Sequence, residues 1–240
     1  MLCVHYSKHF LRSTPHLFPD MNIVRFYFKV VVKSLILFLL LKSFFLLLDL
    51  IQKENLVNAA RVISSHGILV LTFTNLAQLP MAKHFICNLR NLSIEDSILM
   101  VASDNSAHDS LLNFEPNINT IYIPSNTRKS DLKYGSRGFK DFIKYRTAIV
   151  LQLLSSNIPV FLVDTDHYWS VSLLEWLRQQ NGWDIIIENN SIPPKLNPCA
   201  GMVFLNSTGT TIQVWKEVLK QLGYFRYRSC KNENSEQKSF

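Results

Sequence analysis

The sequence predicts an α/β domain built on a mostly parallel sheet, preceded by a transmembrane helix. Three observations lead to this prediction. Short apolar runs rich in β-branched residues alternate with longer stretches whose apolar residues recur at helical spacing. Strands that alternate with helices typically form a parallel sheet covered by helices on both faces. A mostly apolar run, residues 30–51, comes before all of them.

The elements of the body follow one another in a regular order. Pro80 is expected in the first turn of a helix, where its missing N–H costs nothing, and Ser103 or Asp104 is expected to cap the next helix. Residues 125–137 are polar and are expected to form a loop. We expect strands at 67–73, 97–102, 120–123, 160–163, 184–187 and 202–205, and helices at 75–89, 104–112, 139–155, 171–180 and 211–222.

The N-terminal run has the length and composition of a membrane span. Seventeen of the 22 residues in 30–51 are Val, Leu, Ile or Phe, and as a helix they extend about 33 Å, enough for a bilayer. Lys42 costs about 3 kcal/mol at the centre of a bilayer, which the apolar residues outweigh. A cleaved signal peptide and a buried core helix are the alternatives. Basic residues gather before or at the start of the run: Lys8, Arg12, Arg25, Lys29 and Lys33.

This charge distribution predicts a type II signal anchor, with the N-terminus in the cytosol and the body across the membrane. The expected organisation is a short cytosolic tail at 1–29, the anchor at 30–51, a stem at 52–66 and one domain at 67–240. Three N-x-S/T sequons lie beyond the anchor, at Asn91, Asn189 and Asn206, and permit a secretory route.

The net charge of +7 does not indicate nucleic-acid binding. Residues 1–53 hold seven Lys or Arg against two Asp or Glu, which is +5, and the remainder carries only +2. The basic residues therefore belong mainly to the membrane-proximal segment, and no basic groove for nucleic acid is expected in the body.

Polar side chains follow three of the expected strands at the point where each strand ends. Thr72, Thr74 and Asn75 come at the end of the first strand, and Asp104 follows the second. Asp164 and Asp166 follow the apolar run PVFLV as an Asp-x-Asp motif. Because ligands of such sheets bind beyond the carboxyl ends of the strands, these groups are expected to gather at one edge.

Two readings of the Asp-x-Asp motif are open on composition and spacing alone. The alternation of a strand points Asp164 and Asp166 to the same side, so both can hold Mg²⁺ or Mn²⁺, which prefer carboxylate oxygens and retain sites for phosphate oxygens. The other reading is that the two aspartates cap the next helix and pair with a surface Lys or Arg.

At this point the body resembles the nucleotide-diphospho-sugar transferase family, glycosyltransferases of the GT-A type. Four segments match the family in its order from about Gly67 to near the C-terminus. They are LVLTFTN, LMVASDNSAHDSL, FKDFIKYRTAIVLQLLSSNIPVFLVDTDHYWS and CAGMVFLNSTGTTIQVW. The resemblance implies a metal-assisted transfer of a sugar from a nucleoside diphosphate, expected to be UDP, to a glycan or glycoprotein. A type II anchor fits a Golgi enzyme of this kind.

The resemblance also implies roles for individual residues. Asp166 would bind the metal directly, and Asp164 would contact the metal or the ribose. Asp104 would hold the ribose or base. Lys144 or Arg146 would reach the diphosphate, although a solvated helix face is an equal alternative for both. The remaining donor-site residues implied are Thr72, Thr74 and Asn75 along the nucleotide pocket and Gly201 at a close approach of the donor or acceptor.

Three departures from the family pattern accompany these matches. Cys199-Ala200-Gly201 stands where Asn-x-Gly is common, Glu236-Gln237 stands for a late Asp-Gln pair, and the family's late His has no counterpart. We therefore expect the C-terminus to be incomplete. An inactive or fragmentary membrane-anchored relative that keeps the fold as a binding domain is the alternative function. Another nucleotide-binding chemistry, such as hydrolysis, is disfavoured because no Walker, G-x-G-x-x-G or G-x-S-x-G motif occurs.

Overall fold

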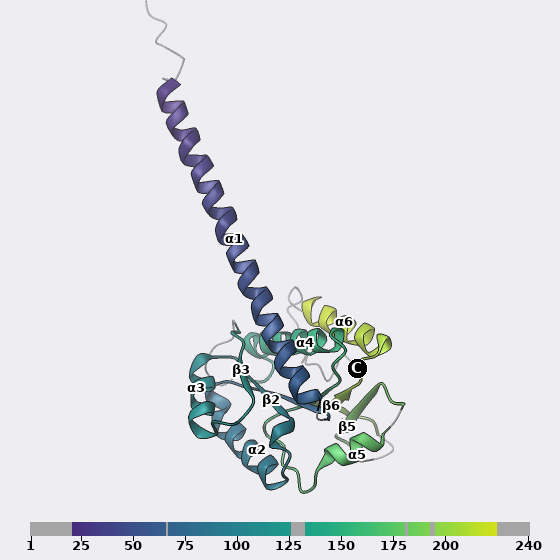
Figure 1. Cartoon of the computed structure of the whole chain (residues 1–240). Coiled ribbons are helices and arrows are strands. Elements are labelled where there is room, and N and C mark those ends of the chain that lie inside the picture. The colour runs from purple at the N-terminus through teal and green to yellow at the C-terminus, as the bar shows by residue number, and fades with distance from the viewer. Residues whose placement is uncertain (1–20, 66, 126–132, 181, 193–194, 225–240) are drawn as a thin grey trace, which may run out of the picture. The chain divides into compact units, whose positions relative to one another are not determined.

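The computed structural model of the chain describes residues 21–65, 67–125, 133–180, 182–192 and 195–224. It divides into two compact units, Met1–Ile51 and Gln52–Phe240. Most of the tail predicted at 1–29 and the Glu236-Gln237 pair lie outside the described residues. Figure 1 shows the elements in chain order.

The first unit contains most of helix α1, Met21–Ser64. From Val30 to Leu48 its side chains are exposed. By length and composition the stretch Val30–Ser64 is able to cross a membrane. The helix is longer than the 30–51 run because nothing in the flanking sequence, neither Pro nor Gly, stops it before Ser64.

The second unit is an α/β fold with one six-stranded sheet in the order β3-β2-β1-β4-β6-β5. The strands are β1 Leu69–Thr74, β2 Ile98–Ala102, β3 Thr120–Tyr122, β4 Val160–Val163, β5 Ile185–Asn189 and β6 Pro198–Leu205. The pairs β1–β2, β1–β4 and β2–β3 are parallel. Strand β6 is antiparallel to both β4 and β5. The predicted α/β class with a mostly parallel sheet is thus confirmed, and β6 makes the sheet mixed.

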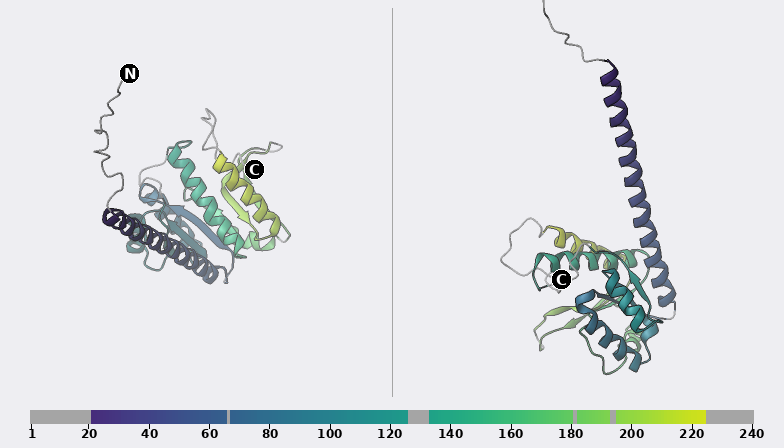
Figure 2. Two further views of the ribbon diagram at one scale, coloured as in Figure 1. Left: turned by 90° about the horizontal axis from the view of Figure 1, so that it is seen from above. Right: turned by 90° about the vertical axis from the view of Figure 1, so that its left-hand side faces the viewer.

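Helices cover both faces of this sheet (Figure 2). They are α2 Leu79–Asn91, α3 Asn105–Phe114, α4 Arg137–Ser155, α5 Leu173–Gln179 and α6 Gly209–Tyr224, with 3-10 turns η1 Leu76–Gln78 and η2 Glu95–Ser97. Helices α4 and α6 lie side by side on one face, where the indole N–H of Trp215 donates to the carbonyl of Thr147 at 3.0 Å. Apolar residues of α2, α3 and α5 form the core of the other face.

The alternation of side chains along the strands divides the core into two layers. On β1, Leu69, Leu71 and Phe73 face the α4–α6 layer, whereas Val70 faces the α2–α3–α5 layer. The segment expected as a stem, 52–66, is helical to Ser64. Its apolar side chains Leu56, Ala60 and Ile63 are buried in the same cluster as the α4–α6 layer.

The predicted element positions differ from the structure mainly at their ends. The helix expected from Asn75 begins at Leu79 after η1, because the Asn75 side chain accepts from Gln78 N–H and caps that turn. Pro80 lies in the first turn of α2, as expected. Asp104 rather than Ser103 caps α3. The strand predicted at 202–205 begins four residues earlier, at Pro198.

Candidate functional site

The carboxyl ends of β1 and β2 are tied together by Asp104. One carboxylate oxygen accepts from Ala107 N–H at 2.9 Å, which caps α3. The other accepts from Leu76 N–H at 2.8 Å, just beyond Asn75. The two strand ends therefore meet at one edge, as predicted, and Asp104 is buried between them with both oxygens bonded to backbone.

A cavity of about 330 Å³ opens beside this edge. Four of the predicted site residues line it: Arg146 from α4, Asp164 and Asp166 after β4, and Gly201 on β6. The remaining lining is largely aromatic or apolar, from Phe73, Met81, Tyr134, Phe139, Phe142 and Ile143, together with Gln78, Thr165, Cys199 and Ala200. A mostly apolar cleft with a few convergent polar groups is the usual form of a small-molecule site.

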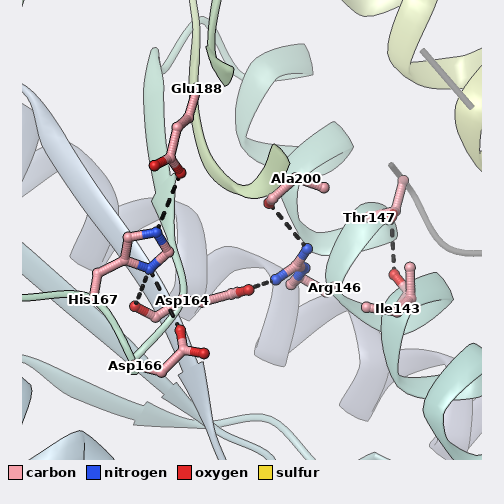
Figure 3. A network of polar contacts seen from close by, with 8 residues as sticks. All are labelled: Ile143, Arg146, Thr147, Asp164, Asp166, His167, Glu188 and Ala200. Carbon is pink, nitrogen blue, oxygen red and sulfur yellow. Dashed lines mark hydrogen bonds and ion pairs between the residues drawn. The ribbon is translucent and has the colours of Figure 1, made fainter. Parts of the chain in front are cut away.

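Arg146 is the buried cation of this cavity. Its side chain is 5% exposed and forms an ion pair with the Asp164 carboxylate, and its other terminal nitrogen donates to the carbonyl of Ala200 at 3.3 Å. A single guanidinium thereby links α4 to the ends of β4 and β6 (Figure 3). Arg146 was predicted to reach a diphosphate or to lie on a solvated helix face. Its burial contradicts the solvated reading.

Asp166, His167 and Glu188 form a second polar group at the edge of the cavity. The Nδ1 atom of His167 lies 3.4 Å from Oδ1 of Asp166 and 3.3 Å from the carbonyl oxygen of Asp164. The Nε2 atom lies 3.4 Å from Oε2 of Glu188. Figure 3 shows the imidazole ring between the two carboxylates. The Asp166 side chain is 69% exposed and therefore accessible to a ligand.

Gly201 leaves room for this arrangement. A Cβ atom at this position would lie 3.0 Å from Oδ2 of Asp164 and 3.0 Å from Cε1 of His167. The carbonyl of Gly201 also accepts from Asp164 N–H at 2.8 Å. The close approach that was expected of a donor or acceptor is made in this structure by the chain's own aspartate and histidine.

The predicted residues of the first strand lie beneath the surface rather than on the cavity. Thr72, Thr74 and Asn75 are buried, and none of them lines the 330 Å³ cavity. Two of their polar atoms, Oγ1 of Thr72 and Nδ2 of Asn75, have no hydrogen-bond partner among the described residues. Lys144 is also outside this cavity, with its Nζ 3.7 Å from the position of a Cβ on Gly223 of α6.

Burial raises the pKa of the Cys199 thiol, and the neighbouring Glu188 carboxylate acts in the same direction, while a hydrogen bond with the backbone of Gly201 opposes them. The thiol is therefore held in its neutral form at the edge of the cavity. Tyr145 lies one residue from Arg146, and its hydroxyl donates to the carbonyl of Ile123 at 2.6 Å. Desolvation raises the pKa of that hydroxyl strongly.

The Asp164 and Asp166 carboxylates suit a metal site shared with a substrate better than a site made of protein ligands alone. Within the described ranges, no group of three His, Cys, Asp or Glu side chains is placed to hold an ion, so a metal cage made only of protein is not formed there. Mg²⁺ and Mn²⁺ commonly bind instead through one or two carboxylates together with substrate phosphates. Asp166 and Asp164, on the wall of one cavity, suit that second manner.

Sequence reasoning did not assign a role to His167 or Glu188. The only local signal was that His167 follows the Asp-x-Asp motif. Glu188 reaches the site because the pairing of β5 with β6 shifts register between Ile187 and Glu188, so that Glu188 lies opposite Cys199. Such bulges commonly re-aim side chains next to active sites, and nothing in the sequence near Glu188 indicates one.

Comparison with known proteins connects this site to a family. The family model described as nucleotide-diphospho-sugar transferase matches residues 93–232. The chain is 26% identical over 197 residues to beta-arabinofuranosyltransferase RAY1 of Arabidopsis thaliana, covering 75% of this chain and 36% of that protein. It is 19% identical over 196 residues to the UDP-D-xylose:L-fucose alpha-1,3-D-xylosyltransferase MGP4 of the same plant, covering 76% and 54%. The chain thus spans between about a third and about half the length of these two relatives.

Among solved structures, the glycosyltransferase GlyE of Streptococcus pneumoniae TIGR4 in its apo form aligns with a TM-score of 0.48 and 12% identity, covering 72% of this chain and 42% of that chain. The galactosyltransferase LgtC, in complex with donor and acceptor sugar analogs, aligns with a TM-score of 0.46 and 10% identity, covering 72% and 69%.

Proposed function

The chain belongs to the nucleotide-diphospho-sugar transferase family, and we propose that it transfers a sugar from a nucleoside-diphosphate donor, UDP-sugar, to a glycan or glycoprotein acceptor. The observation that carries this proposal is the cavity at the carboxyl ends of the strands, which Arg146, Asp164 and Asp166 line together. This is where ligands of open α/β sheets bind. The family match covers all three residues.

The diphosphate is proposed to lie against Asp166, with a Mn²⁺ or Mg²⁺ ion between them. When bound, such an ion neutralises the charge that develops on the diphosphate as the sugar bond breaks. Asp166 offers an accessible carboxylate for this purpose. Asp164 keeps its place through the ion pair with Arg146, so Arg146 contributes by fixing that carboxylate.

The nucleoside is proposed to bind at the end of β1, near Asn75 and Asp104. The amide Nδ2 of Asn75 is a buried donor without a partner among the described residues, and such a group costs free energy unless something accepts from it. Asn75 is buried in this structure, so its amide meets the nucleoside only when neighbouring side chains move aside on binding. A carbonyl oxygen of a uracil ring is then an acceptor of the right kind. Asp104 serves this part of the site by joining the two strand ends.

The sugar and the cellular location are proposed on separate grounds. Two relatives are named for the transfer of arabinofuranose and xylose, so pentose donors are the first to test. A hexose donor remains a second choice. The helix Val30–Ser64 can span a membrane by length and composition, and the basic residues before it support a single-pass type II protein of the Golgi with residues 67–240 in the lumen.

A membrane-anchored relative without turnover is the alternative, and its specific basis is that among the described residues no three His, Cys, Asp or Glu side chains are placed to hold an ion. The test is calorimetric binding of UDP to the full chain in detergent, with and without Mn²⁺, beside Asp166→Asn. Release of UDP from UDP-arabinofuranose and UDP-xylose is measured in parallel. We expect Mn²⁺-dependent binding that Asp166→Asn abolishes, together with UDP release. Binding without release from any donor supports the alternative, and no binding to the folded chain contradicts both.

A further inference from the structure

His167 occupies a position that the proposed reaction does not explain. Its ring has oxygen atoms on both sides: Oδ1 of Asp166 and the carbonyl of Asp164 face Nδ1, and Oε2 of Glu188 faces Nε2. The side chain is only 22% exposed, although the Asp166 side chain beside it is 69% exposed. An imidazole held in this way is fixed in orientation and has one nitrogen directed at the exposed carboxylate (Figure 3).

The backbone that carries Asp166 and His167 is anchored at both ends. At the front, Asp164 N–H donates to the carbonyl of Gly201. At the rear, Trp169 N–H donates to Oδ1 of Asn88 and the Asn88 amide donates to the carbonyl of Trp169, both at 2.8 Å. The Trp169 ring packs between Phe85 and Phe161. The short turn between these anchors therefore holds the backbone of Asp166 and His167 in place.

The far side of the ring is set by the irregular pairing of β5 with β6. On β6 the residues between Cys199 and Val203 have no partner on β5, since Ile187 pairs with Val203 and Glu188 with Cys199. This places Glu188 beside the ring, and Gly201 passes it without a side chain. The bulge and the glycine within it thus accommodate one histidine.

An exposed aspartate without such a partner samples several rotamers. When a ligand binds, the side chain is fixed in one rotamer, and this loss of conformational entropy weakens binding. Groups that orient a metal ligand typically change metal affinity by about 10- to 100-fold when removed. We propose that His167, supported by Glu188, is a positioning residue that holds the Asp166 carboxylate in the orientation needed to bind the metal–diphosphate of the donor. This proposal rests on the proposed function, because it requires a donor bound through a metal at Asp166.

Different substitutions at His167 test its contact with Asp166 and its contact with Glu188 separately. In His167→Asn the amide nitrogen stands near the position of Nδ1 and keeps a donor toward Asp166. In His167→Gln it stands near the position of Nε2 and points toward Glu188. His167→Ala removes both. If orientation of Asp166 is the role, the Mn²⁺ concentration that half-saturates binding at fixed UDP rises by about 10-fold or more in His167→Ala and His167→Gln, and less in His167→Asn. Glu188→Ala gives a smaller rise.

The experiment measures UDP binding to the full chain in detergent by calorimetry, at constant pH and at a series of Mn²⁺ concentrations. His108→Ala is the matched control. His108 has the same side-chain exposure of 22% and contacts a carboxylate, Asp109 at 3.6 Å, but Asp109 does not line the cavity, whereas Asp166 does. UDP affinity without metal and the thermal midpoint Tm are measured for every variant. We expect the metal-free UDP affinity and Tm of His167→Asn and His167→Gln to stay near those of the unmodified chain. If His167 had only a structural role, its replacement would lower Tm without changing the Mn²⁺ concentration needed for binding.

The outcomes separate this proposal from the proposed function. If the unmodified chain binds UDP only with Mn²⁺ and Asp166→Asn abolishes this binding, but the His167 variants behave like His108→Ala, the positioning role is wrong and the proposed function stands. The role is also wrong if His167→Asn and His167→Gln are equally impaired in parallel with a loss of Tm. If the unmodified chain binds UDP without any Mn²⁺ dependence, the metal-assisted function fails, and the positioning role fails with it.

Discussion

The guanidinium of Arg146, on α4, pairs with the carboxylate of Asp164, directly after β4. The arginine is buried and the aspartate side chain is 42% exposed, so the pair joins the interior of the domain to the wall of the cavity. Removing the two partners therefore has unequal effects on stability. Loss of the aspartate leaves a buried charge with fewer partners, whereas loss of the arginine leaves a carboxylate that water can still reach.

Asp164→Ala is therefore expected to lower the free energy of unfolding by about 1–3 kcal/mol, in the range of hydrogen bonds to charged groups and reduced by the exposure of Asp164. Asp166→Ala removes an exposed carboxylate and is expected to change the free energy of unfolding by about 0.5 kcal/mol or less. Urea denaturation of the two variants in detergent, followed by tryptophan fluorescence, measures the difference. Equal stabilities would show that the Arg146–Asp164 pair does not contribute to folding.

Gly201→Ala places a Cβ about 3.0 Å from both Asp164 and His167, so one of these side chains has to move. We expect UDP binding in the presence of Mn²⁺ to weaken by about tenfold or more, since both groups belong to the proposed donor site. Gly209→Ala is the control, because a Cβ there meets no atom within 4 Å. Calorimetry of both variants checks this, and unchanged binding in Gly201→Ala would remove Gly201 from the site.

Asn75→Asp tests whether the buried amide serves the nucleoside. The substitution keeps an oxygen that caps η1 by accepting from Gln78 N–H and replaces the unpartnered donor with an acceptor. The affinity for UDP is expected to fall by about 10-fold or more, because a buried group that loses its partner costs about 1–3 kcal/mol. Asn119→Asp is the comparison, because the amide of Asn119 donates to the carbonyl of Asp96 and Asn119 does not line the cavity. Equal effects of the two variants on UDP affinity would place the nucleoside elsewhere.

Burial raises the pKa of the Cys199 thiol, which predicts how its reactivity depends on pH. The thiolate is the reactive form. Alkylation of Cys199 is therefore expected to keep accelerating above pH 9, where an ordinary thiol with a pKa of about 8.5 is mostly deprotonated and its rate levels off. Because Cys199 lines the cavity, UDP with Mn²⁺ is expected to slow the reaction. Peptide mass spectrometry after timed iodoacetamide treatment reports the rate at this cysteine.

Glycan attachment tests the proposed lumenal location. Asn91 is exposed at the end of α2. The Asn189 amide donates to two backbone carbonyls, and the Asn206 side chain accepts from Ser207 N–H. We therefore expect Asn91 to be the best acceptor of the three sequons. Expression in eukaryotic cells should give a glycosidase-sensitive shift in gel mobility that Asn91→Gln largely removes. A chain without any glycan would contradict the orientation.

The sequence by itself determined the alternation of strands and helices, since apolar periodicity and caps such as Asp104 are local signals. It also placed the Asp-x-Asp motif at the end of a strand, which the structure bears out for β4. These features depend on residues a few positions apart, and their errors are confined to the ends of elements, such as the start of α2 at Leu79.

The tertiary structure alone decided which groups meet in the cavity. Arg146 reaches Asp164 across 18 residues, and Glu188 reaches His167 across 21. Both contacts depend on the packing of α4 and on β6, which enters antiparallel between β4 and β5 with a shift of register. The direction of β6 and the bulge depend on pairing between distant segments, which no local pattern of side chains encodes. For this reason the sequence could indicate a candidate pair of aspartates and name Arg146 as a site residue, but not that Arg146 pairs with Asp164 or that His167 lies beside Asp166.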